Sequence, residues 1–440
     1  MNKQILRLAI PNILSNLSVP LLGAVDTAVI GHLEEVYYLG AIAVGSIVFD
    51  FIFWGFGFLR MGTTGLVAQA YGAGNEIETR RILLRVLLVA LSASLAILFL
   101  QWPILELSLR VINASPEVEN FMSQYYQIRI YSAPATLALF AFNGWFLGMQ
   151  NARFPMYITI LLNVVNIVLN LLLVLKFNLN VSGVAWGSLI ASYVGVSVAI
   201  FLYRLRYHTF FSGINWGSIF DTTELKKFFS VNSDIFIRTL CLIFSYAFFI
   251  AKSAESGDVI LAANTILLQL WYISAYGVDG FAFAAESLVG KYKGAKDTHN
   301  LNSAIKGTLL WGLGLGFIGS IVYWFSGDVL ITIFTDQEMV IQAAGYVLIW
   351  TILAPLINSI CFIWDGVYIG ATSTAAMRNS MLIATFLVFV PVFYITQNLL
   401  GVHALWLSMF AFMVVRGISL TLLAPGYIFN TSLLKLYRNL

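Results

Sequence analysis

The sequence predicts an all-α, polytopic membrane protein with twelve transmembrane helices. Of its 440 residues, 60% are hydrophobic, 15% are aromatic and 10% are charged, which leaves too little polar surface to cover a soluble globule of this size. A spanning helix needs about 20 apolar residues, and with a short loop each span uses roughly 35, so about twelve spans fit. The apolar runs lack the strict apolar and polar alternation of membrane barrel strands, which makes the spans helical.

The spans follow one another with short connections. The N-terminal apolar run is long and lacks a small-residue cleavage site, so we expect the first helix to remain in the protein. The expected spans are residues 6–32, 40–71, 82–105, 121–148, 155–176, 182–205, 227–251, 259–289, 305–325, 340–370, 379–400 and 401–427.

Basic residues indicate the orientation. With a cytoplasmic N-terminus, most Lys and Arg residues of the connections lie inside, whereas the outer connections hold only Arg110, Lys176 and Lys252. This asymmetry predicts that both termini are cytoplasmic. The net charge of +3 is no sign of nucleic-acid binding, because the basic residues are distributed by loop.

An internal repeat divides the chain into two halves. The run L-V-A-Q-A-Y-G-A-G-N at 66–75 matches L-V-G-K-Y-K-G-A-K-D at 288–297, and N-G-W-F-L-G at 143–148 matches D-G-V-Y-I-G at 365–370, both with an offset of 222. Six helices return the chain to its starting side, so the repeat is parallel, and two such lobes fit rocking about a central site. We expect an N-terminal lobe at 1–205, a cytoplasmic linker at 206–226 and a C-terminal lobe at 227–440.

One carboxylate interrupts the first span. Asp26 lies in an apolar segment, and a charge at membrane depth costs at least about 2.5 kcal/mol, so such an acid usually faces a cavity, a partner or a proton. Pro20 lacks an amide hydrogen and permits a bend in the same helix. We interpret Asp26 as a group whose protonation biases a rearrangement near Pro20, against the alternative of a carboxylic acid permanently satisfied by amides.

The fifth span carries a stripe of amides. Asn163, Asn166 and Asn170 are spaced i, i+3 and i+7 on one helix face. Such a stripe either lines a polar cavity or forms interhelical hydrogen bonds as packing contacts. Ser188 in the sixth span is a further polar candidate, with a small packing residue as its alternative interpretation.

Other ionisable residues occupy the remaining spans. Asp365 lies at the repeat position of Asn143, so it is either a second-lobe polar site or a member of an ion pair. Arg60, Arg238 and Glu286 are expected near inner helix ends, where they snorkel or pair. The roles of Asp50 and Asp279 stay open at this point.

Enzyme chemistry finds little support in the sequence. The four histidines lie at or near loops without an H-E-x-x-H pair, and no Walker loop or G-x-S-x-G elbow occurs. We therefore expect a transporter without a cofactor or a bound metal, and not an enzyme.

Three long motifs resemble a known transporter family. They read P-L-L-G-A-V-D-T-A-V-I-G-H-L from Pro20, F-L-R-M-G-T-T-G-L-V-A-Q-A-Y-G-A-G-N from Phe58 and W-D-G-V-Y-I-G-A-T-S-T-A-A-M-R-N-S-M from Trp364. The chain resembles the multidrug and toxic compound extrusion (MATE) transporters, in particular their DinF-like bacterial branch, over nearly all its length. The resemblance implies an inner-membrane antiporter with two six-helix lobes. Such an antiporter exports organic, often cationic or amphipathic, compounds in exchange for H+ or Na+.

The resemblance also implies roles for individual residues. Asp26 matches the family's cation-coupling aspartate, Asn166 matches an asparagine of the fifth helix, and Ser188 stands where a threonine is common. The family pattern N-x-x-x-D reads N-I-V-L-N here, so Asn170 replaces a second acid. Because asparagine does not titrate, H+ coupling through Asp26 is favoured, with Na+ as the alternative.

Two alternative functions, a flippase and an intramembrane enzyme, would each need a feature of its own. A lipid or lipid-linked oligosaccharide flippase would need a hydrophilic, strongly basic central cavity, and an intramembrane enzyme would need a clustered His, Cys or acid constellation. The expected partners are small organic substrates, the coupling ion and the lipid bilayer, without nucleic acid, and a monomer is expected.

Overall fold

The computed structural model describes residues 1–31, 35–112, 114–207, 219 and 221–429, apart from the side chains of 19–22, 24–31 and 36. Every regular element in those ranges is helical. The first half contains α1 (Asn2–Gly31), α2 (Val36–Gly55), α3 (Phe58–Gly72), α4 (Glu76–Phe99), α5 (Gln101–Ile112), α6 (Pro116–Arg129), η1 (Ile130–Ser132), α7 (Ala133–Gly148), α8 (Arg153–Asn170), η2 (Leu171–Lys176) and α9 (Asn180–Tyr207). The second half contains α10 (Thr222–Glu255), α11 (Asp258–Gly294), α12 (Thr298–Phe334), α13 (Glu338–Gly370), α14 (Thr374–Leu382), η5 (Ile383–Phe389), α15 (Val390–Leu400) and α16 (Val402–Tyr427).

The helices match the expected membrane spans. Within the described ranges, eleven helical segments are long and apolar enough to cross a membrane. The 30 residues of α1 add a twelfth element about 45 Å long. The prediction of an all-helical, polytopic membrane protein is therefore confirmed.

The third expected span, 82–105, was wrong at its C-terminal end. Helix α4 ends at Phe99, and a separate helix, α5, begins at Gln101. Pro103 explains this break, because in a continuous helix its ring would clash with the carbonyl of Phe99 four residues earlier. In the first turn of a new helix a proline is tolerated.

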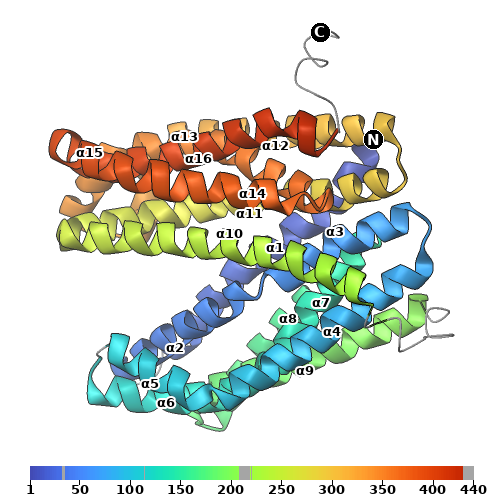
Figure 1. Ribbon diagram of the computed structural model, residues 1–440. Helices are drawn as coiled ribbons and strands as arrows, with labels where there is room; N and C mark the ends of the chain where they lie inside the picture. Colours follow the sequence, from blue (N-terminus) through green and yellow to red (C-terminus); the bar gives the residue numbers. More distant parts are fainter. Residues whose placement is uncertain (32–34, 113, 208–218, 220, 430–440) are drawn as a thin grey trace.

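The helices form two lobes that meet at one end (Figure 1). We call this the joined end; it carries the α3–α4, α7–α8, α11–α12 and α13–α14 turns. The α5–α6 and α15–α16 turns lie at the opposite, open end, toward which the ribbons of the two lobes diverge (Figure 1).

The backbone repeats itself with the offset found in the sequence. Left-handed conformations occur at Gly74 and Lys296, and again at Gln150 and Thr372, so each pair differs by 222. The helix caps repeat as well, because Asn75 caps α4 with its side chain just as Asp297 caps α12. Corresponding turns in the two lobes therefore have the same local structure.

Contacts across the joined end obey the same symmetry. A Cβ added to Gly72 would lie 2.7 Å from the carbonyl carbon of Lys291, and one added to Gly294 would lie 2.7 Å from that of Gln69. Residues 69 and 72 correspond to residues 291 and 294 in the repeat, so the two contacts are reciprocal. A Cβ on Gly290 would meet the Cβ of Ala68, its own repeat partner, at 2.6 Å. An approximate twofold axis therefore passes between Ala68 and Gly290.

The first helix of each lobe packs against the other lobe. The Asn16 side chain of α1 donates a hydrogen bond to the carbonyl of Tyr276 on α11, and the Tyr292 hydroxyl donates to Gln4 at 2.6 Å. Correspondingly, Asn232 of α10 packs against Gly62 of α3. These two exchanged helices connect the lobes.

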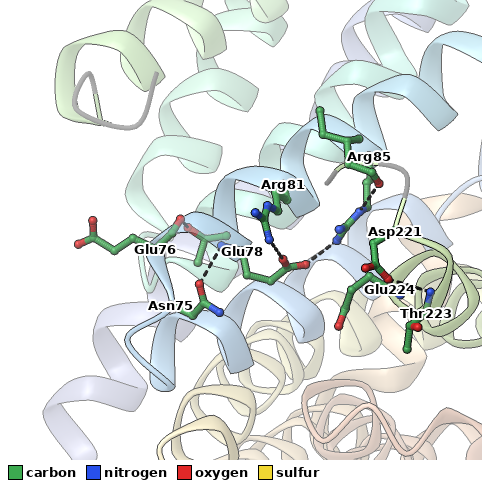
Figure 2. A network of polar contacts seen from close by, with 10 residues as sticks. Asn75, Glu76, Glu78, Arg81, Arg85, Asp221, Thr223 and Glu224 are labelled. Atoms are coloured by element: carbon green, nitrogen blue, oxygen red, sulfur yellow. Dashed lines mark hydrogen bonds and ion pairs between the residues drawn. The ribbon is translucent and has the colours of Figure 1, made fainter. Parts of the chain in front are cut away.

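A polar network attaches the connection between the lobes to α4 (Figure 2). The buried Arg85 donates to the carbonyl of Ile219 at 2.9 Å and pairs with Glu78 at 2.5 Å. The Asp221 side chain accepts hydrogen bonds from the backbone amides of Thr223 and Glu224 and thereby caps the N-terminus of α10. Most of the predicted linker 206–226 lies outside the described residues, and the exact lobe boundaries remain a prediction.

Candidate functional site

The two residues on which the coupling hypothesis depends lie on α1. The backbone of α1 is helical through Pro20 and Asp26, but both side chains lie outside the described part of the structure. The structure therefore leaves the predicted bend and the protonation site as predictions.

The amides of α8 form a buried hydrogen-bonded chain. Asn170 donates to the Asn166 side chain at 2.9 Å, and Asn166 donates to the Ser188 hydroxyl of α9 at 3.0 Å. Asn163 donates to the Ser18 hydroxyl of α1 at 2.9 Å. The structure thus brings together three of the predicted site residues, Asn166, Asn170 and Ser188, and joins α8 to both α1 and α9.

The backbone around Asn170 allows this close packing. Gly187 of α9 lies against the Asn170 side chain and leaves no room for a Cβ. Directly after Asn170 the helix widens into the π-helical segment η2, a feature that often occurs at functional sites. The amide chain therefore ends at a local irregularity of α8.

Asp365 lies in a buried ion-pair cluster of the second lobe. Its Oδ2 pairs with Arg416 of α16 at 2.6 Å and also with Arg238 of α10. All three residues are at most 7% exposed. The hypothesis that Asp365 belongs to an ion pair is thus the one that the geometry supports. Arg238 was expected near an inner helix end, either snorkelling or paired; it lies inside α10 instead, and it is paired with Asp365.

Polar contacts also join the two lobes at the joined end. Arg60 of α3 pairs with the buried Glu286 of α11 at 3.4 Å, in agreement with the expectation of structural pairing. The Gln69 side chain donates to the Gly370 carbonyl at 2.9 Å, and Gln150 donates to the Ser287 hydroxyl at 2.8 Å. Neither glutamine was predicted from the sequence, although Gln69 lies within the repeat run at 66–75 and Gln150 follows the run at 143–148 by two residues.

The arrangement suits a protein that moves two rigid bodies. The lobes touch through backbone contacts at glycines, hydrogen bonds and an ion pair on the side of the joined end, and through α1 and α10, which pack against the opposite lobe. The buried amides of the first lobe offer oxygen and nitrogen groups beside α1. Asp50 is exposed on α2 and Asp279 is half-buried on α11, and neither takes part in the hydrogen bonds of the amide chain described above.

A comparison with protein families finds two matches within this chain. The MatE family model matches residues 11–172 and matches again at residues 235–395. The two matched segments cover most of the chain, and one falls in each lobe.

Curated relatives cover the whole length of the chain. It is 37% identical to the DNA damage-inducible protein F of Escherichia coli over 95% of this chain and 91% of that protein. It is 23% identical to the probable multidrug resistance protein NorM of Thermotoga maritima, covering 94% and 90% of the two chains.

Solved structures show the same fold. The MATE transporter VcmN of Vibrio cholerae in the bent form superposes with a TM-score of 0.87 at 18% identity, over 98% of this chain and 97% of that chain. The two-lobed architecture described above is thus that of a MATE-type transporter.

Proposed function

Because this chain belongs to the MatE family of membrane transporters, we propose that it is a secondary active multidrug exporter. It exchanges organic, often cationic or amphipathic, compounds for H+. Relatives named as multidrug resistance or export proteins support this substrate class.

The proposed location is the bacterial cytoplasmic membrane with both termini inside. The distribution of Lys and Arg supports this orientation. The joined end, which carries Arg80, Arg81 and Lys291 near its turns, then faces the cytoplasm and the open end faces outward. The structure corresponds in this proposal to the outward-facing state, and the transporter acts as a monomer.

The proposed coupling group is Asp26. The observation that carries it is the buried amide face of α8, where Asn166 bonds to Asn170 and Ser188 and Asn163 of the same face donates to Ser18 of α1. Protonation of Asp26 removes a charge and changes the hydrogen bonds that it makes. A bend near Pro20 then disturbs the substrate contacts, and the substrate leaves outward. Return to the inward-facing state releases the proton.

The driving force is sufficient for export. One charge crossing 100 mV contributes about 2.3 kcal/mol. This energy corresponds to roughly fiftyfold accumulation of a neutral substrate per proton.

Efflux from proteoliposomes tests the proposal. We expect a fluorescent organic cation to leave under an imposed pH gradient with the native protein and to stay with Asp26→Asn. Asp50→Asn is the matched control, because it removes an exposed acid from the neighbouring helix. Efflux that continues in Asp26→Asn would show that another group couples transport.

The choice of ion is tested at Asn170. In Asn170→Asp a second carboxylate enters the amide chain, so we expect Na+ to support efflux better than in the native protein. The same assay with and without Na+ measures this change. An unchanged ion preference would make Asn170 a packing residue.

One observation favours the alternative of a lipid or lipid-linked oligosaccharide flippase. The cluster of Arg238, Arg416 and Asp365 carries one more positive than negative charge inside the second lobe. A flippase would scramble fluorescent lipids and give no gradient-driven efflux in the assay above.

A further inference from the structure

A cavity of about 520 Å³ lies at the joined end. The first half of α1, the α7–α8 turn, the start of α8 and the end of α9 form one side, and the end of α11 forms the other. Its lining includes four cationic side chains and several aromatic hydroxyls. The cationic residues are Arg7, Arg153, Arg206 and Lys291.

Within the part of the chain that the structure describes, no carboxylate compensates the charge of this cavity. Among the described residues, no acidic side chain lines the cavity and no carboxylate pairs with any of its four cations. The neighbouring α4 contrasts with it, since Arg81 and Arg85 both pair with Glu78 (Figure 2). Basic residues that served only to orient the chain could be paired in the same way. The convergence of four unpaired cations in one cavity therefore needs another explanation.

The other groups around the cavity suit an anionic oxygen ligand. Helix α8 begins at Arg153, so its N-terminal amides and dipole add positive potential on this side. Tyr71 and Tyr157 line the cavity and are about half exposed. Tyrosine is enriched where membrane proteins meet the headgroup region. Basic cavities between spanning helices bind anionic lipid headgroups.

We propose that this cavity binds an anionic phosphate group, supplied by a phospholipid headgroup or by a soluble phosphate compound. The phosphate bridges the lobes, because Arg7, Arg153 and Arg206 belong to the first lobe and Lys291 to the second. Its binding stabilises the conformation in which the lobes meet at the joined end. This site is distinct from the amide chain around Asn166 and does not depend on the transport proposal.

Thermal unfolding of the full-length protein in neutral detergent tests the proposal. The probes are short-chain phosphatidylglycerol, short-chain phosphatidylcholine and inorganic phosphate, all at equal ionic strength. The concentration dependence of the unfolding midpoint gives an apparent dissociation constant for each probe. Arg153→Gln combined with Arg206→Gln is the cavity variant. Lys226→Gln combined with Lys306→Gln removes the same charge from exposed sites outside the cavity.

We expect phosphatidylglycerol to stabilise the native and control proteins and to bind the cavity variant about thirtyfold more weakly. Each cation near a lipid phosphate contributes about fivefold. Stabilisation by phosphatidylglycerol alone identifies a lipid headgroup, and equal stabilisation by inorganic phosphate identifies a soluble anion. If the double variant does not fold, Lys291→Gln serves instead, with an expected fivefold loss. Stabilisation by phosphatidylcholine to the same extent, or equal affinities in the cavity and control variants, would overturn the proposal.

Discussion

Replacing Gly72 by alanine is expected to push the two lobes apart at the joined end. The new methyl group would lie 2.7 Å from the carbonyl carbon of Lys291, whereas ordinary contact begins at 3.4 Å. The obstructing atoms are backbone, so no side chain can turn away. The lobes must separate locally by at least 0.7 Å, the difference between these two distances.

The energy of this overlap sets the size of the effect. Overpacking by a methyl group typically costs about 1 to 3 kcal/mol. In Gly72→Ala this cost falls on the conformation with a closed joined end and is relieved when that end opens. The ratio of the two conformers is then expected to change by about 5- to 150-fold.

Distances between spin labels at the open end report this change. Labels at Glu117 on α6 and Ser256 after α10 sit on different lobes, at exposed positions. The native cysteines, Cys241 and Cys361, are both buried. Double electron–electron resonance is expected to show a shorter distance in Gly72→Ala, because the lobes approach at the open end when they part at the joined end.

Two further variants make the result interpretable. Gly294→Ala is expected to have the same effect, because it is the repeat partner of Gly72 and meets Gln69 at the same distance. Gly314→Ala is the control, since its methyl group would have no neighbour within 4 Å. A folded Gly72→Ala protein with the native distance distribution would refute the reasoning.

Three other predictions concern stability. Arg60→Gln leaves the buried Glu286 unpaired and is expected to lower the free energy of unfolding by about 3 to 5 kcal/mol. The double variant Arg60→Gln, Glu286→Gln is expected to recover most of the lost unfolding midpoint. A double variant as unstable as Arg60→Gln would contradict this. Asn166→Ala is expected to lower the free energy of unfolding by about 1 to 2 kcal/mol through its lost bonds to Ser188 and Asn170. Chemical denaturation measures this loss against Ser192→Ala, whose hydroxyl donates to the Ser188 carbonyl of the same helix. The backbone amide of Asn300 lowers the pKa of the half-buried Asp297, so the support that Asp297 gives to α12 is present at neutral pH and lost as the pH falls through that lowered pKa. Amide exchange in the first turn of α12 should show this pH dependence, and Asp297→Asn should remove it.

Spans and repeat could be predicted because they depend on local properties of the chain. A run of about 20 apolar residues defines a span whatever its neighbours are. The turns at 72–75 and 294–297 have a left-handed backbone at the same repeat position, Gly74 and Lys296, and both lie within the matching runs 66–75 and 288–297. The error at α5 was also local, because Pro103 breaks the helix although the apolar character of the sequence continues across it.

Lateral pairing could not be predicted in the same way. Asp365 and Arg238 are 127 residues apart, and only the packing of α10 against α13 and α16 brings the charges together. The amide chain was partly accessible, because helical spacing places Asn166 and Asn170 on one face. The separate bond from Asn163 to Ser18 depends on how α1 crosses α8, which no sequence pattern states.

The exchange of first helices affects how the protein is made. The Asn16 to Tyr276 hydrogen bond joins residues 260 positions apart. At about 5 to 20 residues per second, the ribosome completes α11 roughly 15 to 50 s after α1 has emerged. During that time the first helix must wait in the bilayer without half of its packing surface. Biogenesis of this transporter therefore has a late docking step, at which α1, the helix that carries Asp26, first meets its second-lobe partner.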